Sequence, residues 1–301
     1  MTTSDNVSAG FLVPDTMENA IIELREMYGV FRNESTVWPM NNGTTIVPRL
    51  SGEVTTYYVG ETSAITASDM TVNQVKLEAK KLASLTTVSS ELNEDAIVSI
   101  ADMIARSVAQ QFAVAEDSAG FLGDGTGTYG GIVGLASALA AGSLYTAGAT
   151  RDLFADLTFA DFESMIGQCK MWKGASPKWY ISQAGWAASM QRLANAAGGV
   201  TMAELAGGMA PSFMGFPVVI SQVLTSALTG TTGLRACYFG DLRMGSYLGS
   251  RRGITIALDG SRYFEQDLVA IKATQRYDLV VHDRGGASTA GGIIGMVFGS
   301  T

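Results

Sequence analysis

The chain has 301 residues, of which 47% are hydrophobic and 16% are charged, so it can bury a substantial core in one large domain or in two to three subdomains. Its formal net charge of −8 predicts poor non-specific affinity for nucleic acid. No apolar stretch approaches the roughly 20 residues that a membrane helix needs, and the N-terminus lacks both the basic and the apolar region of a secretory signal. We therefore expect a soluble protein that is made in the cytoplasm and has no membrane partner.

The N-terminal part predicts an arm followed by a short amphipathic helix. Residues 1–13 are small and polar, and little in them favours a fixed structure. Asp15 and Glu18 have the spacing of a capping box, and Gly29 is a plausible helix end. Between them, one apolar stripe follows at helical spacing: Met17, Ile21, Leu24 and Tyr28. This stripe needs a surface to pack against.

Residues 43–88 change to the period of β-strands. Val75 and Leu77 alternate with Lys76 and Glu78, which is typical of a strand with one buried face. Residues 60–69 contain no lysine or arginine and predict a flexible, mildly acidic tip between two strands. Because a two-stranded ribbon is only marginally stable alone, we expect it to lie against its own chain or against a neighbour.

A long helix is expected over 93–118. Asn93 followed by Glu94 and Asp95 is a favourable helix start, because a side-chain cap and two acids meet the positive end of the helix dipole. Gly120 is expected to end this helix.

A glycine-rich segment follows, and Gly125 to Gly130 spell G-x-G-x-x-G. This pattern indicates a dinucleotide site only where a strand enters it and a helix leaves it. Here the predicted order is helix first, so a nucleotide-dependent enzyme is retained only as an unfavoured alternative. Asp117 and Asp124 flank the segment, but the spacing lacks the alternating ligands of a calcium loop, and turn or capping roles are favoured.

The remaining elements predict an α+β class, because several strands are not regularly connected through helices. Residues 195–235 are expected to be loops broken by short elements, and the residues from Gly285 onwards a small, glycine-rich tail. We predict helices at 158–170 and 184–193, and strands at 178–181, 217–220, 237–239, 254–258 and within 263–281.

Residues capable of catalysis or metal binding are sparse. His282 is the only histidine, so a Ser-His-Asp triad or a histidine metal cluster is not expected, and a position at a strand end is favoured. Cys169 and Cys237 form no C-x-x-C motif, and we expect both to be reduced and buried. The expectation is a protein without catalytic residues, metal or cofactor.

The order of these parts resembles the major capsid proteins of tailed bacteriophages, which share the Hong Kong 97 capsid fold. The resemblance rests on three short motifs, Phe121-Leu-Gly-Asp-Gly-Thr-Gly, Gly215-Phe-Pro-Val and the stretch from Phe264 to Asp278, and on the order of arm, hairpin and long helix. It implies an arm at 1–35, an E-loop hairpin at 43–82, a P-domain at 83–174 with its spine helix at 93–118, an A-domain at 175–250, returning P-domain strands at 251–284 and a tail at 285–301.

Two departures from the family pattern affect what the resemblance implies. Some members crosslink a lysine of the E-loop tip to an asparagine of a neighbour, but the tip at 60–71 has no lysine, and the stretch after Phe264 offers Asp267 and, seven residues further, Thr274. We therefore expect no covalent crosslinking. Members with a fused scaffold carry about a hundred further residues ahead of the arm, so either a separate scaffold or a processed chain is expected here.

The resemblance implies a structural protein of the virion, assembled in the host cytoplasm through hexamers and pentamers into an icosahedral shell around double-stranded DNA, without sequence-specific binding. Scaffolding, portal and decoration proteins are possible partners. An encapsulin-like compartment with an enzyme cargo is the alternative within the same fold. The residues expected to take part are the arm stripe (Met17, Ile21, Leu24, Tyr28), hairpin charges (Glu61, Asp69, Lys76, Lys80, Lys81), a glycine hinge (Gly120, Gly123, Asp124, Gly125, Gly127) and P-domain contacts (Arg251, Arg252, Asp267).

For the charged residues, alternatives stay open. Arg251 and Arg252 could contact DNA phosphate, but salt bridges between subunits are favoured. Lys76, Lys80 and Lys81 fit either pairing with acids of an adjacent subunit or a solvated strand face. An exposed ion pair contributes only about 0–1 kcal/mol, so we expect buried apolar area to supply most of the stability of a shell.

Overall fold

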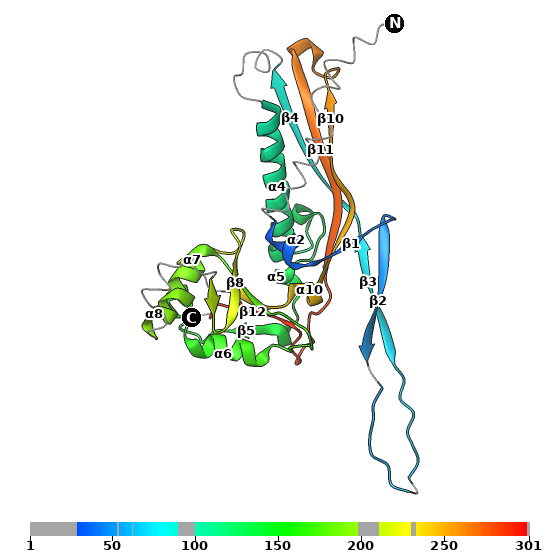
Figure 1. Ribbon diagram of the computed structural model, residues 1–301, viewed down its shortest axis with the longest axis vertical. Coiled ribbons are helices and arrows are strands. Elements are labelled where there is room, and N and C mark those ends of the chain that lie inside the picture. The colour runs from blue at the N-terminus through cyan, green and yellow to red at the C-terminus, as the bar shows by residue number, and fades with distance from the viewer. Residues whose placement is uncertain are drawn as a thin grey trace.

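The computed structural model describes residues 29–52, 54–61, 63–89, 100–197, 211–229 and 233–299. The predicted arm helix with its stripe at Met17, Ile21, Leu24 and Tyr28 lies outside the described residues, as does the predicted start of the long helix. The described chain is mixed α+β, as the sequence predicts, and consists of two sheets with their helices and a separate two-stranded hairpin (Figure 1).

The first sheet has four strands in the order β1-β10-β11-β4. The two longest strands, β10 and β11, pair antiparallel, and β11 also pairs antiparallel with β4. Helix α4 lies along this sheet (Figure 1) and buries Val108, Ala109 and Phe112 against Ile254 and Ala273. The strands are β1 (Thr36–Pro39), β10 (Ser246–Asp259), β11 (Leu268–Val281) and β4 (Lys80–Ser89), and the helix is α4 (Ile100–Leu122).

The second sheet has six strands in the order β5-β12-β9-β6-β8-β7, covered by α6 and α7. Its core contains Phe162, Trp179 and Phe239, with the ring centroids of Trp179 and Phe239 4.3 Å apart. The elements are β5 (Leu144–Thr146), β6 (Lys178–Ile181), β7 (Ser212–Phe213), β8 (Phe216–Ile220), β9 (Arg235–Gly240), β12 (Ile293–Val297), α6 (Phe159–Gln168), α7 (Gln183–Trp186) and α8 (Arg192–Ala196).

Local sequence explains the best predicted elements. Helix α6 is capped by Thr158, whose amide nitrogen and hydroxyl both donate to Asp161 Oδ2 at 2.8 and 2.9 Å. Strand β6 occupies the predicted range 178–181, with Trp179, Tyr180 and Ile181 buried. The predicted helix at 184–193 corresponds to α7, a π turn at Ala187–Gln191 and α8.

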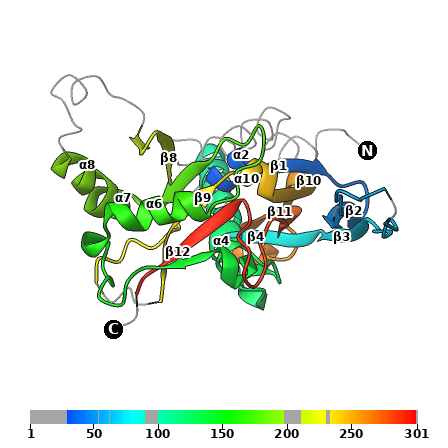
Figure 2. The same ribbon diagram turned by 90° about the horizontal axis from the view of Figure 1, so that it is seen from below.

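The hairpin pairs β2 (Thr44–Gly52) antiparallel with β3 (Thr71–Glu78), which confirms the predicted ribbon. Val75 and Leu77 are buried at its root, and the distal part projects away from both sheets (Figure 1). Seen from below, the hairpin and helices α6 to α8 lie at opposite ends of the molecule (Figure 2). The predicted hairpin range extended to residue 82, but Lys80 and Lys81 already pair with β11 as part of β4.

Three predicted boundaries were wrong. The long helix continues past Gly120 to Leu122. Gly120 is not a helix end but a packing position, since a Cβ there would stand 2.4 Å from the Phe31 ring. The tail after Gly285 contains β12, a central strand whose Ile293, Ile294 and Met296 are fully buried. Strand β10 begins at Ser246 in the four-stranded sheet, so the predicted break at residue 250 falls inside a strand.

Candidate functional site

Helix α2 (Val30–Glu34) is held on the long helix by a buried carboxylate. Asp117 Oδ1 accepts a hydrogen bond from the Phe31 amide at 2.7 Å, and Oδ2 accepts one from the Val30 amide at 3.1 Å. Burial raises the pKa of Asp117 to about 6, against the opposing effect of these two amides. Asp117 therefore caps a helix 86 residues away in sequence, in agreement with the capping role that the sequence favours.

The neighbouring Glu116 forms a second attachment that the sequence analysis missed. Its side chain is fully buried, and both carboxylate oxygens accept from the Arg32 guanidinium at 3.1 Å. Gln275 of β11 also donates to Glu116. A buried pair of this kind is strongly destabilising to break, because one charge would remain uncompensated. The partners are 84 residues apart, and no local pattern marks such a pair.

The same short helix also reaches the second sheet. Lys178 of β6 donates to both oxygens of Glu34 at 2.7 and 2.9 Å. Helix α2 is thus bonded at one end to α4 and at the other to the six-stranded sheet, and it joins the two sheets.

The glycine-rich segment forms a closed turn at the end of α4. Gly125 donates to the Ile132 carbonyl and Gly134 donates to the Gly123 carbonyl, both at 3.0 Å. Asp124 Oδ1 accepts from the Thr126 hydroxyl and amide, which hold the pKa of Asp124 below its usual value. A helix enters this turn, and Gly127–Tyr129 form only a single 3-10 turn, so the geometry differs from a dinucleotide site.

The predicted hinge glycines have different surroundings. Gly120 and Gly123 are packed so closely that a Cβ would collide with the Phe31 ring or with backbone atoms. Gly125 has a φ of +81° and adopts a conformation that favours glycine, whereas Gly127 has nothing within 4 Å of a built Cβ. The spacing of these four glycines in the sequence could not distinguish the closely packed ones from the free one.

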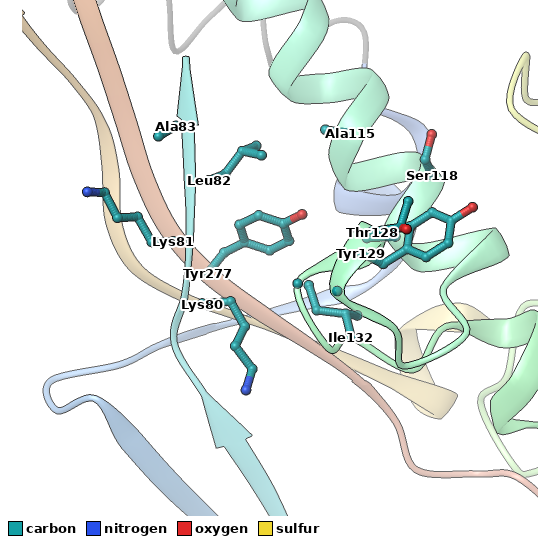
Figure 3. A pocket seen from close by; sticks show the side chains of 13 residues that line it. Lys80, Lys81, Leu82, Ala83, Ala115, Ser118, Thr128, Tyr129, Ile132 and Tyr277 are labelled. Carbon is teal, nitrogen blue, oxygen red and sulfur yellow. The ribbon is translucent and has the colours of Figure 1, made fainter. Parts of the chain in front are cut away.

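A groove of about 540 Å³ lies between this turn, α4 and β4 (Figure 3). Leu82 and Tyr277 line one wall, and Ser118, Thr128 and Tyr129 line the opposite one (Figure 3).

Of the three predicted contact lysines, Lys76 on the hairpin and Lys80 on β4 have a partner within the chain. Lys80 lies 3.2 Å from Glu78, and Lys76 also pairs with Glu78, so hydrogen bonds from these two lysines lower the pKa of Glu78. Lys80 and Lys81 point to different sides of β4 (Figure 3). Glu61 and Asp69 lie at or near the exposed tip, far along the hairpin from this cluster.

The hairpin exposes apolar side chains over most of its length. Ile46, Leu50 and Val72 lie on the face opposite to Val75 and Leu77, because side chains alternate across a strand. Further exposed apolar side chains follow toward the tip: Val54, Tyr57, Tyr58, Val59, Ile65 and Met70. The root is attached to the body through Arg49, which donates to the His282 carbonyl.

The predicted P-domain contacts are not brought together. Arg251 and Arg252 lie on β10 beside an irregularity in its pairing with β11, and Arg252 donates to the Thr274 hydroxyl at 2.8 Å. Asp267 lies in the turn before β11 with a φ of +52°.

The remaining reactive groups have structural surroundings. His282 follows the end of β11 and packs against Tyr247, with 4.4 Å between the ring centroids and the rings tilted by 33°. Burial and the nearby Arg49 lower the pKa of His282. Neither cysteine forms a disulfide, and burial raises the pKa of both thiols, that of Cys169 to about 11. Cys237 is fully buried as expected, whereas Cys169 is only half-buried. The described ranges contain no cluster of three residues suited to a metal, and none of their helices could cross a membrane.

Comparison with known proteins identifies a family and several solved structures that this chain is similar to. The model of the Phage capsid family matches residues 9–287. The major capsid protein of Klebsiella oxytoca phage phiKO2 is 31% identical over 121 residues, which are 40% of this chain and 28% of that protein's length. Among solved structures, the capsid of a native GTA particle aligns with a TM-score of 0.73 at 19% identity over 91% of each chain. A structure from Mycobacterium phage Adephagia aligns with a TM-score of 0.66 at 18% identity over 90% of each chain. These structures share the fold.

Proposed function

The chain belongs to the phage capsid family, a family of structural virion proteins without enzymatic activity, and we propose that copies of it assemble through hexamers and pentamers into an icosahedral shell around double-stranded DNA. The exposed apolar hairpin is the observation that carries this proposal. Contiguous apolar surface on a projecting ribbon is typical of a protein interface, and no other part of the described chain covers it (Figure 1).

The root of the hairpin supports a role in contacts between subunits, because it is attached to the body of its own chain while the distal part of the hairpin projects from it. Val75 and Leu77 are buried, the Glu78 amide donates to Asp278, and Arg49 donates to the His282 carbonyl. The fixed root sets the direction in which the ribbon projects, so its apolar face is presented to a neighbour.

The two sheets and the hairpin suggest how the subunit is divided into domains. We assign the four-stranded sheet with α4 to the P-domain, the six-stranded sheet to the A-domain at the symmetry axes, and β2 and β3 to the E-loop. The arm clamps another neighbour in this arrangement. The lysine-free tip supports assembly without covalent crosslinks, and the net charge of −8 supports enclosure of DNA without a sequence-specific grip.

The glycine turn and the hairpin allow bending between hexamer and pentamer forms. Gly125 and Gly127 are the better candidates for movement, since Gly120 and Gly123 are closely packed. We assign Arg251, Arg252 and Asp267 to contacts between the P-domains of neighbouring subunits.

Replacing Leu50 with glutamate tests the proposal. Leu50 is half-exposed on the outer face of the hairpin, so a carboxylate there leaves the isolated fold intact but meets an apolar neighbour in a shell. We expect the wild type and Leu50→Met to form closed shells, or rings of five and six, in negative-stain electron microscopy, and Leu50→Glu to remain unassembled with unchanged circular dichroism. Normal shells from Leu50→Glu would contradict the role of the hairpin.

The contents of purified shells separate the two functions that this fold supports. Enclosed double-stranded DNA would support a genome container, whereas a copurifying enzyme would support an encapsulin-like compartment. A discrete small oligomer of the wild type with bound nucleotide would refute both.

A further inference from the structure

We propose that the phosphates of double-stranded DNA bind a basic surface at the junction of the two sheets. Three segments form this surface: the loop after α6 (residues 169–177), helix α10 (Leu242–Gly245) with its cap Asp241, and residues 282–292 between β11 and β12. The second segment connects the six-stranded sheet to the four-stranded one, and the third connects them in the opposite direction. This inference rests on the proposed function and adds which face of the subunit meets the enclosed DNA.

The loop after α6 is attached to α10 by a capping carboxylate. Asp241 Oδ1 accepts the Arg243 amide at 2.9 Å, and Asp241 Oδ2 accepts the Ser176 amide of the loop at 2.8 Å. The carbonyl of Arg243 also accepts the Thr36 hydroxyl at 2.7 Å, which fixes the backbone of α10 against β1. The loop and the arginine on α10 therefore keep a constant relative position.

A second carboxylate attaches the same loop to residues 282–292. Asp283 Oδ2 accepts the indole nitrogen of Trp172 at 3.1 Å and the Gly292 amide at 2.9 Å. The Lys170 amide donates to the Gly291 carbonyl at 3.0 Å. Side chains of all three segments line one small depression, among them Lys170, Trp172, Met244 and Asp283. The three segments thus present their side chains on a single surface.

This surface is positively charged in a chain that is acidic overall. The three segments contain only two carboxylates, those of Asp241 and Asp283, and both accept N–H donors of the same segments. Four exposed cations stand against them, and none of the four forms an ion pair within the described part of the chain: Lys170, Lys173, Arg243 and Arg284. Because the whole chain has 20 basic and 28 acidic residues, this excess of cations is local.

Exposed apolar side chains lie among these cations. Met171, Trp172 and Met244 are each more than two-fifths exposed. The Lys170 ammonium lies 4.3 Å from the centroid of the Trp172 ring, whose indole nitrogen is held by Asp283. An oriented aromatic ring beside several cations suits nucleic acid, because the cations neutralise phosphates while the ring packs against sugar or base.

The spread of the cations favours DNA over an acidic protein segment. The four side chains come from three separate segments and do not converge on one point, so they suit a ligand that carries charge at short, regular intervals. Double-stranded DNA carries one charge per roughly 1.7 Å of its axis, whereas an extended peptide has at most one side chain per roughly 3.3 Å. Phosphate contacts of this kind carry no sequence information.

Binding of a fluorescently labelled DNA duplex to the purified full chain tests the assignment. The double variant Lys170→Gln and Lys173→Gln removes two phosphate contacts, so the plot of log binding constant against log salt concentration should become shallower by about 2. The double variant Arg262→Gln and Lys272→Gln is the matched control, because it makes the same change of net charge at two other exposed cations and should leave the slope unchanged. Both variants should keep the circular dichroism of the wild type. Equal slopes for the two variants would overturn the proposal.

Ultraviolet crosslinking of DNA-filled shells locates the contact in the assembly. Peptides that carry nucleotides are identified by mass spectrometry, and we expect them to include residues 170–173 or 243–244. Filled shells whose crosslinks lie only elsewhere would refute this surface and leave the proposed function intact, whereas a chain that forms no DNA-filled shells would refute both. A wild type that binds polyglutamate but no duplex at low salt would identify an acidic protein segment as the ligand and overturn the proposal.

Discussion

Replacing Gly123 with alanine is expected to destabilise the folded subunit itself, before any assembly. A Cβ at this position would stand 2.3 Å from the Ala119 carbonyl oxygen and 2.8 Å from both the Gly134 amide nitrogen and the Ile132 carbonyl oxygen. All three are backbone atoms, so no side chain can rotate away. The effect is steric, because the φ of Gly123 lies outside the left-handed region.

The size of the effect follows from the turn that must open. Relief of the collision stretches the bonds from Gly125 to Ile132 and from Gly134 to Gly123, each of which contributes about 1 kcal/mol. Overpacking adds about 1–3 kcal/mol, and the reduced freedom of the unfolded chain returns roughly 0.4–1 kcal/mol. We therefore expect a loss of about 2–4 kcal/mol in the free energy of unfolding.

Gly127→Ala is the matched control, since nothing lies within 4 Å of its Cβ, and it should change stability by less than about 0.5 kcal/mol. Urea unfolding of the unassembled chain, followed by circular dichroism, should give a lower midpoint with unchanged slope for Gly123→Ala alone. Equal midpoints for the two variants would refute the steric argument.

Two further predictions concern the attachment of α2. Because burial raises the pKa of Asp117 to about 6, against roughly 3.9 in an unfolded chain, the folded state binds this proton more tightly, and the contribution of Asp117 to stability falls as pH rises from about 4 to about 6. Asp117→Asn should flatten the pH dependence of the urea midpoint in that window, and an unchanged slope would contradict the assignment. For the pair Glu34 and Lys178, at 2.7 Å and mostly buried, a double-mutant cycle with Glu34→Gln and Lys178→Met should give a coupling of about 1 kcal/mol, and a coupling near zero would show that the pair does not join the sheets.

Elements with a strong local signal could be predicted from the sequence. Strand β6 is a short buried apolar run, and α6 begins at a Thr158 and Asp161 capping pair, so both are specified by neighbouring residues. The hairpin could be predicted because Val75 and Leu77 alternate with lysine and glutamate. Strand β12 was missed because four apolar residues around a glycine, within a glycine-rich stretch, resemble a tail, and only its pairing with β5 and β9 reveals a central strand.

The amino-acid sequence by itself determined the class of the fold, the order of its elements and the family resemblance, because periodicity, caps and short motifs depend on residues that are close in the chain. The tertiary structure alone decided which carboxylates are buried, where the long helix ends and which surfaces remain uncovered. Asp117 caps a helix 86 residues away, Phe31 occupies the space that Gly120 leaves open, and Ser35 meets Arg243 in one groove. Such contacts depend on how distant segments pack, and their hydrogen bonds and collisions exist only after the chain has folded.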